Sequence, residues 1–317
     1  KRRMRASGVL ARWACTELLK CVEACNQLPE AWLPLVVERE TVGAVLEADV
    51  ETLTRSESFR LVDRTLAFSE ELEAASVQER TEAVAALTQE LREANVVTGW
   101  RDELVPVATA FGAEPKFLVE RAAYPLLGAK GYGVHVNGFT RVDDEVELWV
   151  GKRSKDKPTW PGLLDHLVAG HQPAGISPAE NVVKEAAEEA GLPRDLALRA
   201  RAAGAVSYRG LDEEGRFKHD VLFCYDLELP DTFVPTPVDG EVETFFKWSL
   251  DTVLDAIIAG VDDPLRSRSD DDVADKLTFK PNVVLVIADF LLRRGFLRPE
   301  MPDYLALLRA LRQGDCR

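Results

Sequence analysis

Three glutamates crowd one stretch of the chain in a pattern that suits the binding of a divalent metal. Glu185, Glu188 and Glu189 follow the spacing i, i+3 and i+4, which puts their side chains on one face of a helix. Carboxylates this close repel one another unless a cation or water lies between them, and their hard oxygen atoms are the ligands that Mg²⁺ or Mn²⁺ prefers. A solvated acidic face on a surface helix would show the same spacing, so both interpretations stay open.

The residues around the glutamates predict the helix that carries them. Ser177 is a favourable N-cap, Pro178 suits the first helical position, and Glu180 occupies the place of a capping-box carboxylate. Gly191 is a typical helix end, so we expect a helix over 178–190. The face that is able to pack inward consists of small apolar residues: Ala179, Val183, Ala186, Ala187 and Ala190.

With these residues in place, the sequence resembles the Nudix hydrolase family. The box of that family runs Gly, five residues, Glu, seven residues, then Arg-Glu-apolar-x-Glu-Glu-x-Gly-apolar; here Gly170 opens it, and Lys184 to Leu192 close it at the correct spacing. Two positions depart from the box, because Ile176 replaces its first Glu and Lys184 replaces its Arg, which has a forked guanidinium. The resemblance implies that Mg²⁺ or Mn²⁺ is bound by three catalytic carboxylates: Glu185, Glu188 and Glu189.

Segments on both sides of the box look like one subgroup of that family. It is the eukaryotic subgroup with an N-terminal domain of unknown function, related to fungal proteins labelled thiamine-pyrophosphokinase-like and to plant Nudix hydrolases. The subgroup implies hydrolysis of thiamine diphosphate or its oxidised analogues to the monophosphate and phosphate. His171 replaces the second Gly of the subgroup's Gly-Gly pair. The segments that carry the likeness are Trp100–Glu103, Phe117–Ala123, Tyr132–Gly138, Leu148–Lys157, Pro161–Asp165, Val168–Gly170, Asp239–Glu243 and Phe279–Asn282.

Charged residues outside the box complete the expected site. The family often places a further Glu downstream of the box, which makes Glu241 or Glu243 the candidate general base. Lys184 and Lys280 are candidate ligands of the substrate phosphates. The densest basic cluster lies just before the box, where it would bind phosphate oxygens or form a solvated loop: Lys152, Arg153, Lys155 and Lys157.

Two aromatic residues and two His residues have a structural interpretation beside a functional one. Trp160 and Phe245 are able to stack on a heteroaromatic ring, but aromatic residues are more often part of the core. We expect His135 and His219 to be structural hydrogen-bonding groups rather than catalytic ones.

Other functions share parts of this pattern. A nucleoside-diphosphate or ADP-ribose pyrophosphatase would use the same metal site with a different substrate pocket. The missing first Glu favours a non-catalytic module that holds a diphosphate without cleaving it. An isopentenyl diphosphate isomerase would need a catalytic Cys, and Cys224 lies in an apolar segment. A thiamine pyrophosphokinase is disfavoured because no ATP-binding glycine loop occurs.

The composition restricts the class of protein further. The chain has 317 residues, with 54 acidic and 39 basic side chains and a formal net charge of -15. This excess argues against a general nucleic-acid-binding surface, and it means that a small diphosphate substrate needs a local cation. No run of about 18 apolar residues occurs, so we expect no membrane span. The five Cys, at irregular spacing, suggest free thiols in a reducing compartment.

The pattern along the chain predicts two α/β domains. Residues 1–123 are expected to form a smaller α/β accessory domain with an amphipathic helix over 77–94. Residues 124–317 are expected to form a Nudix α/β/α sandwich with a mixed sheet and C-terminal helices. We expect its strands at 132–139, 145–151, 205–209 and 219–227, further helices at 249–259, 282–294 and 302–312, and an exposed loop at 262–276.

The first 16 residues hold five basic groups and no acidic one. This suits a cytoplasmic protein with a short basic arm, and equally a plastid or mitochondrial protein with the remnant of an Arg-rich transit peptide. The sequence leaves the oligomeric state open, a homodimer included.

Overall fold

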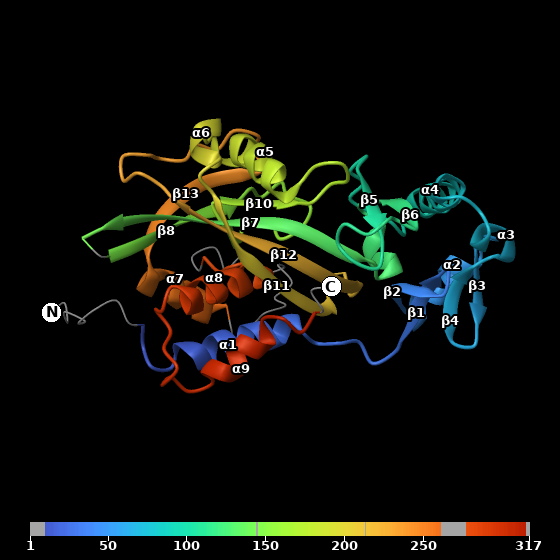
Figure 1. The fold of residues 1–317 in the computed structure, drawn as a ribbon, viewed down its shortest axis with the longest axis horizontal. Coiled ribbons are helices and arrows are strands. Elements are labelled where there is room, and N and C mark those ends of the chain that lie inside the picture. The colour runs from blue at the N-terminus through green and yellow to red at the C-terminus, as the bar shows by residue number, and fades with distance from the viewer. Residues whose placement is uncertain (1–9, 144, 213, 261–276, 315–317) are drawn as a thin grey trace.

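The computed structural model describes residues 10–143, 145–212, 214–260 and 277–314. Two main β-sheets organise these residues: a four-stranded sheet at one end of the molecule, and a seven-stranded sheet in its main body (Figure 1). The basic segment at residues 1–9 and the predicted loop over 262–276 lie outside the described residues.

Alternating apolar residues build the smaller sheet. In β1 (Trp32–Val37), Leu33, Leu35 and Val37 are buried and the residues between them are partly exposed, as in a strand with one covered face. Helix α4 (Val77–Glu93) shares this core, which confirms the helix predicted over 77–94. The sheet has the order β2-β1-β4-β3, and the other elements of this part are β2 (Glu40–Leu46), α2 (Glu47–Thr54), β3 (Phe59–Val62), β4 (Thr65–Phe68) and α3 (Glu70–Glu73).

A hairpin and a short helix connect the two sheets. Strands β5 (Leu104–Val107) and β6 (Phe117–Glu120) pair antiparallel, and the 3₁₀ helix η1 (Tyr124–Leu127) follows them. At Gly128 the backbone is left-handed, with φ 53°, and a Cβ there would lie 1.7 Å from the carbonyl oxygen of Ala44. Only glycine therefore fits at this position, where the chain passes close to β2 before it enters the larger sheet.

The larger sheet is mixed, as predicted. Its main path runs β11-β12-β7-β8-β13, with β10 paired to β7 and β9 paired to β8. Strands β12 and β7 are parallel, and the other pairs are antiparallel. The bounds are β7 (Lys130–Val142), β8 (Glu145–Arg153), β9 (Leu164–Asp165), β10 (Val168–His171), β11 (Arg201–Leu211), β12 (Phe217–Glu228) and β13 (Val242–Ser249).

Helices cover both faces of the larger sheet, which confirms the α/β/α sandwich (Figure 1). Helix α5 (Pro178–Ala190) and the short α6 (Arg194–Ala197) pack on one face, around Val134, Val136 and Tyr225. The opposite face carries α7 (Leu250–Ala259), α8 (Pro281–Arg293) and α9 (Tyr304–Ala310). No helix in the described ranges has the length and apolar character that a membrane crossing requires.

The first helix of the chain belongs to this second layer. Helix α1 (Ala14–Cys25) precedes the smaller sheet in sequence, yet it lies beside α8 and α9 (Figure 1). Its buried face, which includes Leu18 and Val22, shares one core with Val283 and Ile287 of α8. The predicted division of the chain at residue 123 stays a prediction, but the larger core draws on residues from both ends of the chain.

Candidate active site

Local capping places the helix that carries the three glutamates. The Ser177 Oγ accepts a hydrogen bond from the Glu180 backbone N–H at 3.2 Å, and the Ser177 N–H donates to the Glu180 carboxylate at 2.8 Å. Gly191 ends the helix in the left-handed conformation, with φ 61°. The predicted helix over 178–190 and its caps are therefore confirmed.

Two of the three glutamates contact β10, and the third is exposed. Glu189 is buried, and its Oε2 accepts the backbone N–H of Ala169 at 2.9 Å. Glu185 lies against Gly170, where a Cβ would stand 2.3 Å from its carboxyl carbon. Glu188 is exposed, and Lys184 bridges it to Glu185, with Nζ 3.0 Å and 3.1 Å from the two carboxylates. The first residue of the family box thus meets Glu185, while Glu189 binds the preceding residue of β10.

Negative charge accumulates at this place. Burial raises the pKa of Glu189 well above its ordinary value, against the Ala169 hydrogen bond, and the charges of Glu185 and Asp165 raise it further. Burial likewise raises the pKa of Glu185, against its ion pair with Lys184. Both shifts have the same physical meaning, which is that the site disfavours its own charge and would be stabilised by an added cation.

Of the two candidate bases, Glu241 acts through its charge on one of the box glutamates. Its charge contributes to the raised pKa of Glu185, and its carboxylate forms an ion pair with Lys157. Burial raises the pKa of Glu241, but Lys157 and the charges of Arg153 and Arg121 outweigh burial, so the pKa is lowered and the group is ionised at neutral pH. Glu243, in β13, pairs instead with Lys152 at 2.9 Å.

The predicted basic cluster splits into different roles. Arg153 is buried, and its guanidinium donates to the carbonyl oxygens of Trp160 and Thr159 and to Asp165 at 2.8–2.9 Å, so it braces the loop after β8. Lys155 is exposed. The remaining members pair with glutamates: Lys152 with Glu243, and Lys157 with Glu241.

Phe245, Trp160 and His219 each contact other parts of the protein. The Phe245 ring packs against the core of the α5 face and close to Gly151. The Trp160 carbonyl accepts the Arg153 Nε–H at 2.9 Å. The ring Nε2 of His219 contacts the carbonyl oxygen of Gly314, in keeping with a structural hydrogen bond.

His135 belongs to a buried cluster of polar side chains on the α8 face of the sheet, and the sequence predicted only part of this cluster. The rings of His135 and His166 meet edge to face at 5.0 Å, and His135 Nδ1 and His166 Nε2 are buried without a hydrogen-bond partner among the described residues. Burial lowers the pKa of His166 to about 4 and that of His135 well below its ordinary value, so both rings are neutral at pH 7. Nearby, burial lowers the pKa of Lys280 to about 8, against the charge of Asp165.

His166 and Arg121 are the residues near the site that sequence reasoning missed. His166 follows Asp165 in the apolar stretch that leads to Gly170, and a polar pair inside such a stretch is the signal that could have found it. Arg121 directly follows Glu120, the last residue of β6, and its charge reaches both His171 and Glu241.

The carboxylate oxygens are hard ligands of the kind that bind a divalent cation. Within the part of the chain that the structure describes, no three His, Cys, Asp or Glu side chains stand ready to hold a metal ion. Glu185 and Glu188 are drawn together by the Lys184 ammonium, and Glu189 is turned to a backbone N–H. The Lys184 ammonium thus already lies between two of the carboxylates. The carboxylate oxygens are the type of donor that Mg²⁺ or Mn²⁺ prefers.

Comparisons with known proteins divide the chain in two. Residues 17–131 match a family model described as a domain of unknown function (DUF4743), and residues 131–265 match the NUDIX domain. The chain is similar to Nudix hydrolase 20, chloroplastic, of Arabidopsis thaliana, at 43% identity over 95% of this chain and 79% of the relative. The identity and both coverages are the same for Nudix hydrolase 24, chloroplastic, of that plant. A solved structure, the NUDIX domain of Shewanella oneidensis NrtR complexed with ADP ribose, aligns with a TM-score of 0.38 and 16% identity over 52% of this chain and 89% of that chain.

Proposed function

Because this chain belongs to the Nudix hydrolase family, and is therefore a hydrolase of phosphoanhydride bonds, we propose that it cleaves thiamine diphosphate or an oxidised analogue to the monophosphate and phosphate. Glu185, Glu188 and Glu189 would hold a divalent metal ion, Mg²⁺ or Mn²⁺, which would assist the reaction. The observation that carries the proposal is the packing of the Nudix-box helix on β10, with the Glu185 side chain against Gly170 and the Glu189 carboxylate on the Ala169 N–H.

Each residue of the site has a separate task in this proposal. The metal, when bound, offsets the charge of the diphosphate and makes a water molecule more acidic. The Ala169 N–H holds Glu189 in place, and Lys184 keeps Glu185 and Glu188 together. Glu241 accepts a proton from the attacking water, for which its ionised state is suited.

The substrate is assigned from the resemblance to the thiamine-related subgroup. Two neutral imidazoles with unpartnered nitrogens, His135 Nδ1 and His166 Nε2, offer hydrogen bonds to the polar edge of a heterocycle. Lys280 adds a cation beside them whose charge is reduced by burial. These groups are buried on the α8 face of the sheet, opposite α5, so the substrate assignment rests on the resemblance and not on them.

Of the compartments expected from the sequence, we propose the plastid. Both Arabidopsis relatives are named chloroplastic. This proposal is independent of the one on the substrate, because the carboxylate site works in the same way wherever the protein resides.

Phosphate release from a panel of compounds tests the proposed function. The full chain is incubated with Mg²⁺ or Mn²⁺ and thiamine diphosphate, its oxo derivative, ADP-ribose or a nucleoside diphosphate, each with and without a chelator. We expect metal-dependent release from the thiamine compounds, and a loss of at least about 100-fold in Glu189→Gln, whose amide oxygen still accepts the Ala169 N–H. Glu90→Gln, on the exposed face of α4, is the matched control and should keep full activity.

Two results would contradict the proposal in different ways. Activity on the nucleotide compounds alone would remove the thiamine assignment and leave the hydrolase site. Undiminished phosphate release by Glu189→Gln would instead remove the assignment of the metal-binding carboxylates.

A further inference from the structure

Arg121 is a charged residue of the N-terminal part of the chain that lies close to the candidate active site. It directly follows β6, and its backbone N–H donates to the carbonyl oxygen of Glu103 at 2.8 Å. Its Nη1 donates to the Glu103 carboxylate, also at 2.8 Å, while 30% of the Arg121 side chain stays exposed. No other acceptor among the described residues binds this guanidinium, so Nε and Nη2 are available to a ligand.

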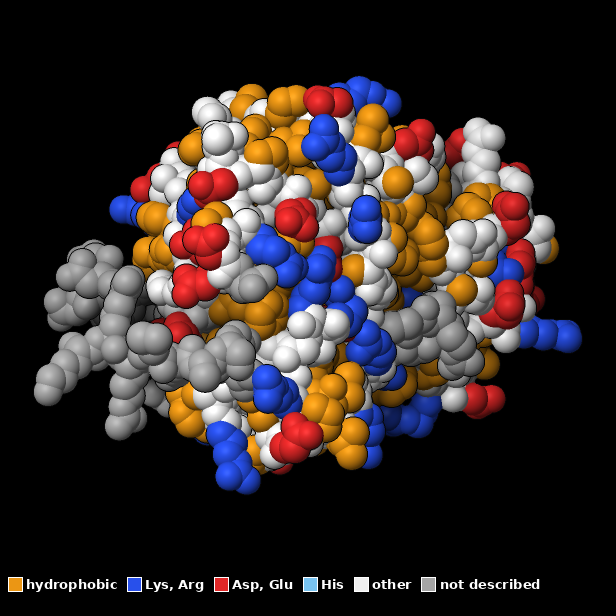
Figure 2. All heavy atoms as spheres, turned by 60° about the vertical axis from the view of Figure 1, so that its left-hand side comes forward, with side chains coloured by type: hydrophobic (Ala, Val, Ile, Leu, Met, Phe, Trp, Pro, Cys, Tyr) orange, Lys and Arg blue, Asp and Glu red, His pale blue; other side chains and the backbone are white. Residues whose placement is uncertain are grey.

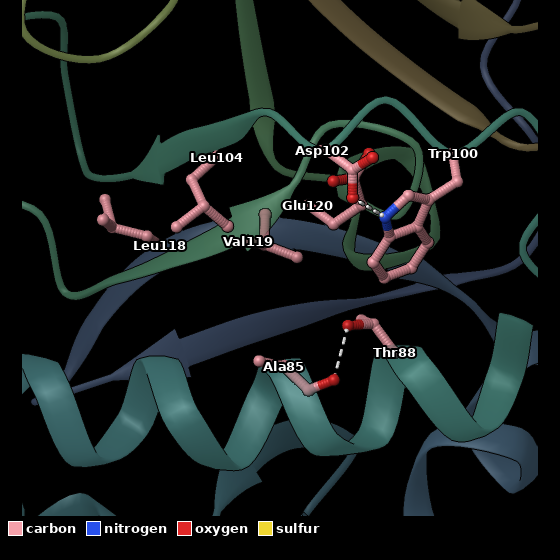
Figure 3. Close-up of a pocket in the computed structure, with 8 residues that line it drawn as sticks. All are labelled: Ala85, Thr88, Trp100, Asp102, Leu104, Leu118, Val119 and Glu120. Carbon is pink, nitrogen blue, oxygen red and sulfur yellow. Dashed lines mark hydrogen bonds between the residues drawn. The ribbon is translucent and has the colours of Figure 1, made fainter.

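The backbone that carries Arg121 is held firmly. The buried carboxylate of Glu120 accepts three backbone N–H groups, from Arg101 at 2.9 Å, Glu103 at 3.2 Å and Ala122 at 3.1 Å. Figure 3 shows Glu120 on the hairpin that lies over α4, at a pocket of about 250 Å³ between the two elements. The hydrogen bonds fix the chain on both sides of Arg121, so its side chain starts from a defined position.

The same turn brings Arg121 to the Nudix box. Three residues later, the ring of Tyr124 lies 5.6 Å from the ring of His171, which follows Gly170. Burial is the largest cause of the lowered pKa of His171, and the Arg121 charge is the next. The same charge helps to lower the pKa of Glu241. The Arg121 charge therefore acts on His171, next to the first residue of the box, and on Glu241, although it comes from another part of the fold.

Three other cations near the site are engaged by the protein itself. Lys184 bridges two glutamates, Lys157 pairs with Glu241, and Arg153 braces its own loop. A guanidinium with free N–H groups matches the geometry of phosphate oxygens, because two donors point in parallel. We propose that Arg121 binds phosphate oxygens of the substrate, so that the N-terminal domain completes the active site. The proposal rests on the proposed function, since it takes a diphosphate as the ligand.

Binding and kinetics of four full-length variants test this role. Arg121→Ala should raise KM for the diphosphate substrate by about 10-fold or more, and it should weaken binding of the non-hydrolysable probe methylenediphosphonate by a similar factor. Arg121→Lys should recover part of both, because it keeps the charge and loses the fork. Glu103→Gln removes the same ion pair as Arg121→Ala but keeps the guanidinium, so its KM should stay near that of the unmodified chain. Arg101→Ala, an exposed arginine of the same turn, is the matched control.

The outcomes separate a binding role from a structural one. Equal losses in Glu103→Gln and Arg121→Ala would mean that the ion pair merely stabilises the hairpin, and this would overturn the proposal. Unchanged KM and probe binding in Arg121→Ala would overturn it as well. If the unmodified chain binds the probe but releases no phosphate, the proposed function fails alone, and the comparison of probe binding still decides the role of Arg121. Absence of probe binding by the unmodified chain would contradict both.

Discussion

Gly170 and Glu185 are matched in size where α5 meets β10. The glycine leaves room for the carboxyl group, because any Cβ at this position would lie 2.3 to 2.6 Å from atoms of the Glu185 side chain. The constraint is one of space and not of backbone conformation, since Gly170 lies in a regular antiparallel pair with Val134. The first residue of the Nudix box therefore determines where a carboxylate lies, as well as how the loop begins.

Gly170→Ala should move Glu185 while the fold persists. We expect phosphate release to fall by about 10-fold or more and the free energy of unfolding to fall by about 1–3 kcal/mol, the usual cost of overpacking. Steady-state kinetics and urea unfolding measure the two effects. Gly260→Ala is the control, because the nearest atom to its Cβ would lie at an ordinary 3.4 Å. Full activity in Gly170→Ala would show that the position of Glu185 does not matter for turnover.

The replacement of the box arginine by Lys184 changes how Glu185 and Glu188 are held. It links Glu185 and Glu188 through a single ammonium, at 3.1 Å and 3.0 Å, where the box has an arginine with two parallel donors. The link between the two carboxylates is therefore kept, with less control over their orientation.

Helices α5 and α4 begin with the same capping motif. Ser177 in α5 and Ser76 in α4 each form a capping box with a glutamate three positions later, Glu180 and Glu79. In α5 the box stands at the end of the Nudix loop, which is also held by Gln172, whose Nε2 donates to the carbonyl oxygen of Ile176 at 2.7 Å. We therefore expect the same local chemistry to affect activity only in α5.

Ser177→Ala and Ser76→Ala form a matched pair that tests this difference. Each should cost about 1 kcal/mol of unfolding free energy, because each removes one N-cap acceptor. We expect kcat to fall in Ser177→Ala, since the loop before α5 loses an anchor, and to stay unchanged in Ser76→Ala. Equal kcat values in the two variants, measured well below the unfolding transition, would show that the cap acts through stability alone.

Packing across the whole molecule ties the two ends of the chain together. Helix α1 lies beside α8 and α9 under the larger sheet (Figure 1), and Leu18 is fully buried in their common core. Residues 17–131 match the domain of unknown function, so part of that segment contributes to the core beneath the Nudix sheet. The N-terminal region is thus a structural part of the hydrolase and not a detachable addition.

Leu18→Ala should destabilise the hydrolase although it lies far from the box in sequence. We expect a loss of about 2–5 kcal/mol, from lost burial and from the cavity left behind. Residual phosphate release as a function of urea concentration, compared with tryptophan fluorescence, measures this loss in the active domain. Leu305→Ala in α9, whose side chain is 76% exposed, should change stability by no more than about 0.5 kcal/mol. An unchanged urea midpoint for activity in Leu18→Ala would mean that α1 does not support the Nudix core.

Charged side chains are distributed unevenly over the surface of the molecule. Figure 2 shows a band of Lys and Arg side chains down the middle of one face, with acidic side chains beside it. The net charge of -15 is an average over faces that differ, so it does not describe each surface. The argument from charge against nucleic acid therefore stays a prediction for the molecule as a whole.

The sequence by itself determined the features that depend on neighbouring residues. The helix over 178–190 and its caps, the hairpin of β7 and β8 and the helix at 77–94 follow from periodicity and capping, which act within a few residues. Spacing along one helix also predicted that Glu185, Glu188 and Glu189 share one helical face. These contacts are local, so they need no knowledge of how the sheet is ordered.

Only the tertiary structure decided which distant residues share the site and the core. The position of Glu241 by the box, the bracing role of Arg153, the approach of Arg121 and the place of α1 all join residues far apart in sequence. Such contacts depend on strand order, on the parallel pairing of β12 with β7 and on the turn at η1. Residue type and local spacing do not determine this order, because many arrangements of the same elements bury the same apolar faces.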